Sequence, residues 1–305
     1  PDSCGGSRKP AQHWKSLHDR GTEGNMINEL VLDDFLRSAL REDIDCGDVT
    51  TDSLISASQQ SQCALYAKEE GVLAGMDAAD RVFHLLDAGI IFQMKKTDGC
   101  TVLPGEKIAE IKGNTRAILS GERVALNILQ RMSGIATKTH RMCELVRDYP
   151  VRITDTRKTL PGFRMLDKYS VTVGGGVNHR MNLSDLVMIK DNHIAAVGSI
   201  ARAVSLAKDK APFPVKIEVE VENLCQLEEA IQAEADIVML DNMDTGEMKK
   251  AVAFADHRVL LEASGNVDED RIAAIAQTGV DIISCGALTH SVRALDISLK
   301  FNREK

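Results

Sequence analysis

The chain has 305 residues, of which 44% are hydrophobic, and its 45 acidic and 37 basic side chains give a formal net charge of −8. This composition excludes wholesale disorder, no stretch approaches the roughly 18 apolar residues of a membrane helix, and the negative charge argues against nucleic acid or an anionic membrane as main partner. Seven cysteines without a C-x-x-C pair favour a reducing cytoplasm over a disulfide scaffold.

The first third of the chain predicts a small α+β sandwich. Residues 1–25 are polar and aperiodic, which indicates a flexible leader. Apolar residues recur at helical spacing over 30–42 and again over 76–86. Short strand-like runs, separated by Gly, Pro and Asp, lie at 62–67, 89–94 and 107–112. Such a mixture of helices and mostly antiparallel strands is typical of an α+β fold.

A different pattern begins near residue 120. Two amphipathic helices are predicted over 122–132 and 139–149. Apolar runs then alternate with helical segments, at 151–154, 170–173, 186–189, 215–221, 237–240, 259–262 and 282–284. Strands that alternate with helices predict a parallel sheet with right-handed crossovers. Seven such runs favour a closed or nearly closed α/β barrel, and an open doubly wound sheet is the alternative.

Acidic residues lie within or directly after two of these runs. Glu218 and Glu220 lie in the run at 215–221, and Asp241 comes directly after the run at 237–240. Side chains alternate along a strand, so Glu218 and Glu220 share one face, and active-site residues of α/β barrels lie at the carboxyl ends of the strands. A buried carboxylate needs a partner. The pattern therefore predicts a cation or a hydroxyl-rich ligand, with structural salt bridges as the alternative, above all for Glu218.

A basic group of residues also follows the apolar runs, namely Arg157, Lys158, His179, Arg180 and Lys190. Arginine binds carboxylates bidentately, and lysine offers phosphate a compact charge. Cations at strand ends of an acidic protein predict a small, highly charged anionic ligand. The alternative is a solvated basic surface.

Two small-residue loops, at 264–266 and 285–287, each precede a predicted helix, near residues 268 and 289. Backbone N–H groups at such places form an anion cradle, and barrels often bind phosphate in their last two βα loops. The chain has no G-x-G-x-x-G fingerprint and no Walker loop. Together these features suggest chemistry on a phosphorylated sugar with an anionic co-substrate. A phosphoribosyl transfer fits, since it needs only Mg²⁺ and basic groups to neutralise the leaving pyrophosphate.

Long motifs in the sequence resemble those of the quinolinate phosphoribosyltransferase family, particularly its bacterial members. They are REDIDCGDVTTDSL, SGERVALNILQRMSGIAT, ITDTRKTLPGFRMLDKY, VGGGVNHR, SDLVMIKDNH, IEVEVENL, IVMLDN, LLEASGNV and ISCGALTHS. The resemblance covers about residues 28–302. It implies an α+β sandwich domain over 26–133, completed by a C-terminal segment at 288–305, and an open seven-stranded α/β barrel over 134–287. It also implies transfer of phosphoribose from phosphoribosyl pyrophosphate to quinolinate with decarboxylation, in NAD biosynthesis.

The resemblance assigns roles to individual residues. Quinolinate binding is assigned to Arg157, His179, Arg180 and Lys190 and, from the neighbouring subunit of a homodimer, to Arg123. Binding of phosphoribosyl pyrophosphate and its phosphates is assigned to Lys158, Glu220, Asp241, Ser264, Gly265, Gly286 and His290. Catalytic roles fall to Lys158, Lys190, Glu220 and Asp241, with Mg²⁺ arriving with the pyrophosphate near Glu220 and Asp241.

Three other functions stay open at this point. One is a paralogous phosphoribosyltransferase with another acceptor. The second is a barrel aldolase, in which Lys158 or Lys190 forms a Schiff base with a keto-acid. The third is a non-catalytic binding protein for anionic metabolites.

Overall fold

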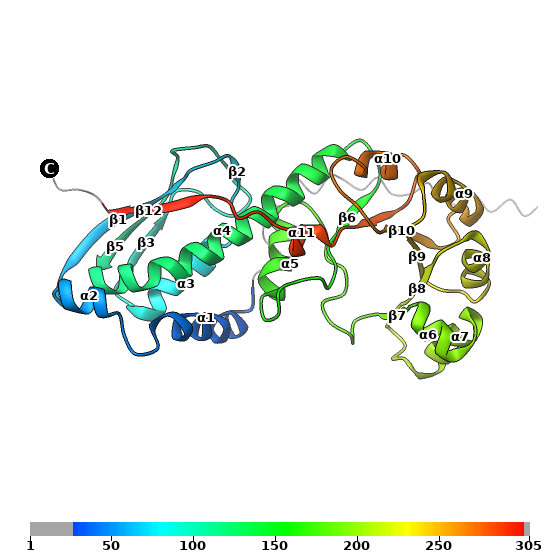
Figure 1. Ribbon diagram of the computed structural model, residues 1–305, viewed down its shortest axis with the longest axis horizontal. Coiled ribbons are helices and arrows are strands. Elements are labelled where there is room, and N and C mark those ends of the chain that lie inside the picture. The colour runs from blue at the N-terminus through cyan, green and yellow to red at the C-terminus, as the bar shows by residue number, and fades with distance from the viewer. Residues whose placement is uncertain (1–26, 302–305) are drawn as a thin grey trace, which may run out of the picture.

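The structure is a computed structural model that describes residues 27–301, so the leader predicted at 1–25 lies outside the described residues. It is elongated and has two lobes side by side, one built on an antiparallel sheet and one on a parallel sheet (Figure 1). None of its helices within residues 27–301 combines the length and the apolar character that crossing a bilayer requires.

The first lobe contains a four-stranded antiparallel sheet in the order β12-β1-β5-β3. Its strands are β1 (Gln60–Ala67), β3 (Ile91–Met94), β5 (Lys107–Asn114) and β12 (Ile297–Phe301), and a small second sheet pairs β2 (Gly71–Val72) with β4 (Thr101–Val102). The helices are α1 (Glu29–Ile44), α2 (Val49–Leu54) and α3 (Met76–Leu86). The prediction of a helix over 76–86 is confirmed by α3.

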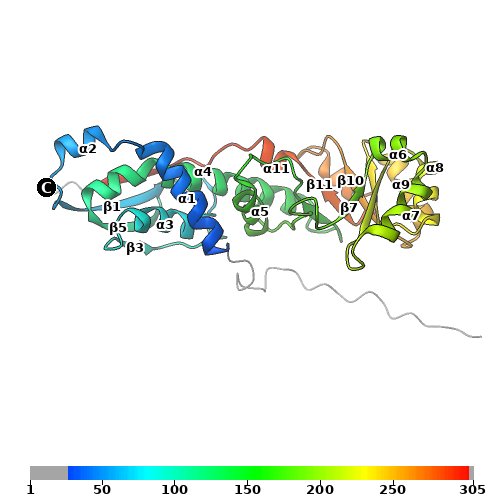
Figure 2. The same cartoon turned by 90° about the horizontal axis from the view of Figure 1, so that it is seen from below.

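The end of the chain returns to this first lobe. Strand β12 pairs antiparallel with β1, so that Ile297 lies opposite Ala67 and Phe301 opposite Cys63. Figure 2 shows from below how the red end of the chain runs from α11 back toward this lobe. The predicted completion of the sandwich by the C-terminal segment is therefore confirmed.

A single long helix, α4 (Thr115–Leu145), runs from the first lobe into the second (Figure 1). The prediction of two separate helices over 122–132 and 139–149 is wrong. A Cβ added to Gly134 would lie 2.3 Å from the carbonyl oxygen of Arg293, so this glycine lets the returning chain cross the helix closely. Gly134 thus serves packing within a continuous helix.

The second lobe contains six parallel strands in the order β6-β11-β10-β9-β8-β7. They are β6 (Arg152–Thr154), β7 (Val187–Ile189), β8 (Ile217–Val221), β9 (Ile237–Asp241), β10 (Leu260–Ser264) and β11 (Ile282–Ser284). The accompanying helices are α5 (Arg164–Val173), α6 (Asp191–Val197), α7 (Ile200–Lys210), α8 (Leu224–Gln232), α9 (Thr245–Ala255), α10 (Ile272–Ala276) and α11 (Ala287–His290).

The strand predicted at 170–173 is wrong, because these residues form the last turn of α5. The hydroxyl of Ser170 donates to the carbonyl oxygen of Leu166, one helical turn earlier, at 2.7 Å. A single parallel bridge between Val177 and Thr154 lies beside β6 instead. The sheet in residues 27–301 thus has six strands rather than the seven predicted, with edge strands β6 and β7.

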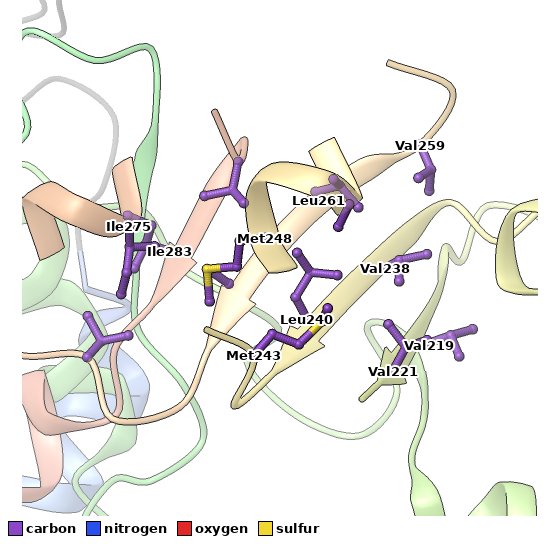
Figure 3. Close-up of a cluster of buried hydrophobic side chains, with 14 of the residues drawn as sticks. Val219, Val221, Val238, Leu240, Met243, Met248, Val259, Leu261, Ile275 and Ile283 are labelled. Atoms are coloured by element: carbon purple, nitrogen blue, oxygen red, sulfur yellow. The ribbon is translucent and has the colours of Figure 1, made fainter. Parts of the chain in front are cut away.

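Alternation along the parallel strands separates a core from a polar interior. Val219, Val221, Val238, Leu240 and Leu261 point toward the covering helices and are buried there (Figure 3). Their sequence neighbours, including Glu218 and Glu220, point to the opposite face. The predicted division of 217–221 into two faces is confirmed.

Candidate active site

A cavity of about 380 Å³ lies at the carboxyl ends of the parallel strands. Its lining residues are Thr156, Arg157, Lys158, His179, Arg180, Met188, Lys190, Glu220, Met239, Asp241, Glu262, Ser264 and Ser284. Asp241, Ser264 and Ser284 are the last residues of β9, β10 and β11. Eight residues predicted for the site thus meet around one cavity, although they are spread over more than 100 positions of the sequence.

Two arginines supply unpaired positive charge to this cavity. The Nε of Arg157 is buried and has no hydrogen-bond partner. Arg180 donates from Nη1 to the carbonyl oxygen of Leu186 at 3.0 Å, and burial together with the nearby charge of Arg157 lowers the pKa of Arg180. Neither guanidinium lies within 4.0 Å of a carboxylate in the part of the chain that the structure describes. This pair is suited to an anion brought from outside.

The two lysines of the cavity differ in their surroundings. Lys190 donates from Nζ to Oε1 of Glu220 at 2.6 Å. Lys158 is exposed, and its aliphatic chain lies against Gly286, where an added Cβ would come within 2.8 Å of the lysine Cδ. A side chain at position 286 would therefore displace Lys158 from this place.

The loops after β9 and β10 interlock. Gly265 has a φ of +99°, and a Cβ at this position would lie 2.1 Å from Oδ1 of Asn242. The side chain of Asn242 also donates from Nδ2 to Oδ2 of Asp241 at 3.1 Å. A side chain at position 265 would therefore displace Asn242 and, through it, disturb Asp241 at the cavity edge.

Four residues predicted for the site do not line this cavity. Gly265 lies behind Ser264, and Gly286 adjoins Lys158. His290 packs beside Gly286 and shares a 2.7 Å hydrogen bond between its Nδ1 and the Ser291 hydroxyl. Arg123 is exposed on α4, away from the cavity lining. The predicted helix start near 268 is also wrong, because α10 begins at Ile272.

An ion pair that the sequence analysis missed holds the backbone of His179. Asp155 and Lys168 are both fully buried and hydrogen-bonded to each other. Oδ1 of Asp155 accepts from the N–H of His179 at 2.9 Å, and Nζ of Lys168 donates to the His179 carbonyl oxygen at 3.0 Å. Burial raises the pKa of Asp155 to about 6 and lowers that of Lys168. The sequence signal that could have identified Asp155 is its position directly after the run at 151–154.

The side chain of His179 lies over two buried carboxylates. Its Nε2 is 3.1 Å from Oε2 of Glu218 and 3.4 Å from Oε2 of Glu262. Its Nδ1 accepts a hydrogen bond from the N–H of Arg180 at 2.8 Å. Both ring nitrogens of His179 therefore have partners within the protein. A histidine that binds quinolinate directly would instead point a ring N–H at a carboxylate of the substrate.

Glu262 is a second residue that the sequence analysis missed. The alternation that singled out Glu218 and Glu220 applies equally to β10, where Leu261 and Ala263 are core residues and Glu262 points inward. The ligand atoms of His179, Glu218 and Glu262 lie within 4.8 Å of one another, close enough to hold a metal ion. The distances from Nε2 of His179 to the two carboxylate oxygens also suit a shared proton, which is a simpler explanation than a metal ion.

Two family models match the chain. The N-terminal domain of quinolinate phosphoribosyl transferase matches residues 48–133, and the C-terminal domain matches residues 135–300. This chain belongs to the quinolinate phosphoribosyl transferase family. The resemblance drawn from the sequence motifs is confirmed.

Several known proteins are similar in sequence to this member of the quinolinate phosphoribosyl transferase family over nearly the whole described chain. A probable nicotinate-nucleotide pyrophosphorylase (carboxylating) from Bacillus subtilis is 45% identical over 273 residues, covering 90% of this chain and 94% of the relative. NadC from Streptococcus pyogenes is 44% identical with a TM-score of 0.87, covering 91% of this chain and 99% of NadC. The nicotinate-nucleotide pyrophosphorylase from Francisella tularensis is 42% identical with a TM-score of 0.87, covering 91% of this chain and 98% of that one. The predicted fold class, an α/β barrel with an N-terminal sheet domain, is confirmed.

Proposed function

We propose that this chain transfers phosphoribose from phosphoribosyl pyrophosphate to quinolinate, releasing pyrophosphate and CO₂ and forming nicotinate mononucleotide for NAD biosynthesis. The observation that carries the proposal is the pair of guanidinium groups, Arg157 and Arg180, without carboxylate partners in the described residues that surround the cavity. Family membership and the names of the relatives support the same reaction.

The cations explain why a diacid is a suitable acceptor. Quinolinate carries two carboxylates beside its ring nitrogen, and Arg157 and Arg180 can each bind a carboxylate through their planar forks. Holding both carboxylates aligns the nitrogen with the anomeric carbon of the sugar. Such alignment can contribute about 7–11 kcal/mol toward lowering the barrier. We propose that Lys190 contributes a third positive charge on the quinolinate side, beside Glu220.

Bond formation turns the ring nitrogen into a quaternary pyridinium. Its positive charge can accept the electron pair that remains when the neighbouring carboxylate leaves as CO₂. The carboxylate at the other position has no such electron sink, so it is retained. Fixed positive charges in the cavity need no reorganisation during this step and stabilise the developing charges.

We propose that the sugar and pyrophosphate bind along the remaining cavity wall, at Lys158, Glu220, Asp241 and Ser264, with Gly265, Gly286 and His290 toward the 5′-phosphate. Mg²⁺ is expected to arrive with the pyrophosphate, where it neutralises phosphate charge. The carboxylate oxygens of Glu220 and Asp241, which both face the cavity, are the hard ligands that Mg²⁺ prefers. These two residues would hold it, directly or through water.

We also propose a homodimer in which Arg123 enters the site of the neighbouring subunit. In support, Arg123 is exposed on α4 and has no ion-pair partner within 4.0 Å among the described residues. A cytoplasmic reaction forms part of the proposal, because the described cysteines are all unpaired, as expected in a reducing compartment.

A Schiff-base aldolase is less well supported. An attacking lysine needs a free amine, but Lys190 already donates from Nζ to Oε1 of Glu220 at 2.6 Å. Lys158 is exposed rather than enclosed in the kind of hydrophobic pocket that activates a Schiff-base lysine.

The proposal is tested by supplying phosphoribosyl pyrophosphate and Mg²⁺ with either quinolinate or nicotinate. Pyrophosphate and CO₂ should appear in equal amounts with quinolinate, and nicotinate should give neither. The exposed substitution Arg202→Ala on α7 serves as a control and should behave like the wild type. Pyrophosphate release with nicotinate alone would point to a paralogous transferase, and release with neither acceptor would contradict the proposal.

A further inference from the structure

The backbone of Lys158 is held on both sides by threonine hydroxyls. The N–H of Lys158 donates to Oγ1 of Thr156 at 3.0 Å, within the loop that follows β6. The hydroxyl of Thr289 donates to the carbonyl oxygen of Lys158 at 2.8 Å, although the two residues are 131 positions apart in the sequence. Thr289 is fully buried in α11, whereas Lys158 is exposed and lines the cavity. A buried side chain thus fixes the backbone of a cavity residue.

Thr289 is itself held by the long helix α4, against which α11 packs (Figure 1). Nη2 of Arg131 donates to the carbonyl oxygen of Thr289 at 3.0 Å, and the same guanidinium pairs with the buried carboxylate of Asp167 on α5 at 2.9 Å. Farther along α4, Lys138 donates from Nζ to the carbonyl oxygen of Ala287 at 2.7 Å. Because two cations of α4 bind the backbone of α11, the hydroxyl of Thr289 reaches Lys158 from a fixed position.

The side chain of Lys158 lies against the same segment. A Cβ added to Gly286 would come within 2.8 Å of Cδ of Lys158 and 3.2 Å of Cδ2 of His290. The ammonium of Lys158 forms no ion pair in the part of the chain that the structure describes. The direction of this side chain therefore depends on its backbone and on its contact with Gly286, and not on a carboxylate.

Two loops of the site meet at Thr289. One follows β6 and contains Lys158, and the other follows β11 and contains α11. The last backbone hydrogen bond between the two segments runs from the N–H of Cys285 to the carbonyl oxygen of Thr154, at 2.9 Å. Beyond it, the bond from Thr289 to Lys158 is the only hydrogen bond that these loops, both within the described residues, make with each other. The spacing of the two loops therefore depends on one hydroxyl group.

We propose that Thr289 is a positioning residue for phosphoribosyl pyrophosphate, which sets the distance between Lys158 and the segment from Gly286 to His290. The inference rests on the proposed function, in which Lys158 faces the pyrophosphate and this segment lies toward the 5′-phosphate. Since one ligand carries both groups, both parts of the site must be in place at once. Groups that are ordered before binding cost less conformational entropy when the ligand arrives. Without the hydroxyl of Thr289, the ligand itself would have to order Lys158.

A purely structural role for Thr289 is the rival explanation. Loss of a buried hydrogen bond lowers stability wherever it occurs, so a fall in melting temperature alone does not separate the two roles. Thr278 offers a matched control, because it is also buried and its hydroxyl donates to the carbonyl oxygen of Ile275 at 2.6 Å. Thr278 follows α10 and does not line the cavity.

The test compares Thr289→Val, which keeps the branched shape but lacks the hydroxyl, with Thr289→Ser, which keeps the hydroxyl, and with Thr278→Val. Assays of CO₂ release from quinolinate give kcat and KM for both substrates, and calorimetry gives Kd for phosphoribosyl pyrophosphate with Mg²⁺. A buried acceptor left without its donor typically changes an equilibrium constant by about 5-fold to 150-fold. We therefore expect Thr289→Val to raise KM and Kd for phosphoribosyl pyrophosphate at least about fivefold, and KM for quinolinate by less than about twofold. Thr289→Ser and Thr278→Val should keep the wild-type values.

A double-mutant cycle tests whether Thr289 acts through Lys158. Calorimetry with phosphoribosyl pyrophosphate and Mg²⁺ is repeated on Lys158→Met and on Lys158→Met/Thr289→Val. Substitutions that remove the same interaction do not add, so Thr289→Val should change Kd by less than about twofold once the ammonium of Lys158 is gone. Additive effects of the two substitutions would overturn the inference.

Other results would also overturn it. These are unchanged KM and Kd for phosphoribosyl pyrophosphate in Thr289→Val, an equal rise in KM for quinolinate, or a loss in Thr289→Ser as large as that in Thr289→Val. If circular dichroism shows Thr289→Val to be unfolded, Thr289→Ala replaces it under the same criteria, and unfolding of both would assign Thr289 a purely structural role. A wild type that releases no CO₂ from quinolinate would contradict the proposed function itself, whereas the preceding outcomes leave that function intact.

Discussion

Replacing Lys168 with methionine should destabilise the barrel strongly, because it leaves a buried carboxylate without its cation. Lys168 and Asp155 are both 0% exposed, and the ammonium also donates to the His179 carbonyl oxygen. Removing one partner of a buried pair typically costs about 3–5 kcal/mol. Native domains are stable by about 5–15 kcal/mol, so Lys168→Met should remove a large part of the free energy of unfolding and still leave a folded protein.

Urea denaturation followed by circular dichroism measures this loss. Two further variants are measured for comparison. Lys208→Met removes an exposed ion pair with Glu234 and should barely change the unfolding midpoint. In Asp155→Asn/Lys168→Met the neutral amide can still accept from the N–H of His179, so the double variant should be more stable than Lys168→Met alone.

The activity of Lys168→Met gives a second readout. Because Asp155 and Lys168 hold the backbone of His179 just before Arg180, KM for quinolinate should rise more than KM for phosphoribosyl pyrophosphate. The reasoning is refuted if Lys168→Met and Lys208→Met have the same unfolding midpoint, or if the double variant is the least stable of the three.

Four further predictions concern the site. Arg157→Ala should lower kcat/KM for quinolinate by about 2–5 kcal/mol, or about 30-fold to several thousand-fold, and near-normal steady-state turnover would refute its placement. Asp241→Asn should abolish turnover without changing the melting temperature, whereas an unfolded variant would favour a structural role for Asp241. Mixing inactive Arg123→Ala with inactive Lys190→Ala should restore some activity through mixed dimers, and failure despite demonstrated subunit exchange would count against a shared site. Against the opposing effect of burial, hydrogen bonds to Glu218 and Glu262 raise the pKa of His179 from its ordinary 6.5 to about 9 in the folded protein, so its stabilisation is complete below pH 6.5 and is lost as pH rises through 9. The loss is at most about 3 kcal/mol, and urea midpoints at the two ends of this range check it.

The polar interior of the barrel was the most predictable part of the molecule. Period-two alternation places Glu218 and Glu220 on the face opposite Val219, and parallel strands bring their carboxyl ends to one edge wherever they lie in the chain. These two rules are enough to gather Arg157, Lys190 and Asp241 around one cavity.

The errors arose where tertiary contacts override local preference. The β-branched residues near Val171 favour a strand, but α5 continues through them and places Lys168 against Asp155. Two helices were predicted over 122–132 and 139–149, but α4 runs unbroken through Gly134, where the chain crossing at Arg293 leaves no room for a side chain. Sequence patterns carry no information about which distant segment will pass so closely.

Glu262 was missed for a different reason. It ends a predicted strand, and its importance depends on two partners, His179 and Glu218, that come from other strands and loops. Position along the sequence indicates the face of the sheet on which a glutamate lies, but not that two glutamates will meet at one imidazole.

A crystal structure with quinolinate bound tests the central claim most directly. The account predicts both carboxylates of quinolinate in the cavity at the carboxyl ends of the strands, within hydrogen-bonding distance of Arg157 and Arg180, with the ring nitrogen turned toward Glu220 and Asp241. Quinolinate bound elsewhere, or in this cavity without contact to either guanidinium, would contradict it.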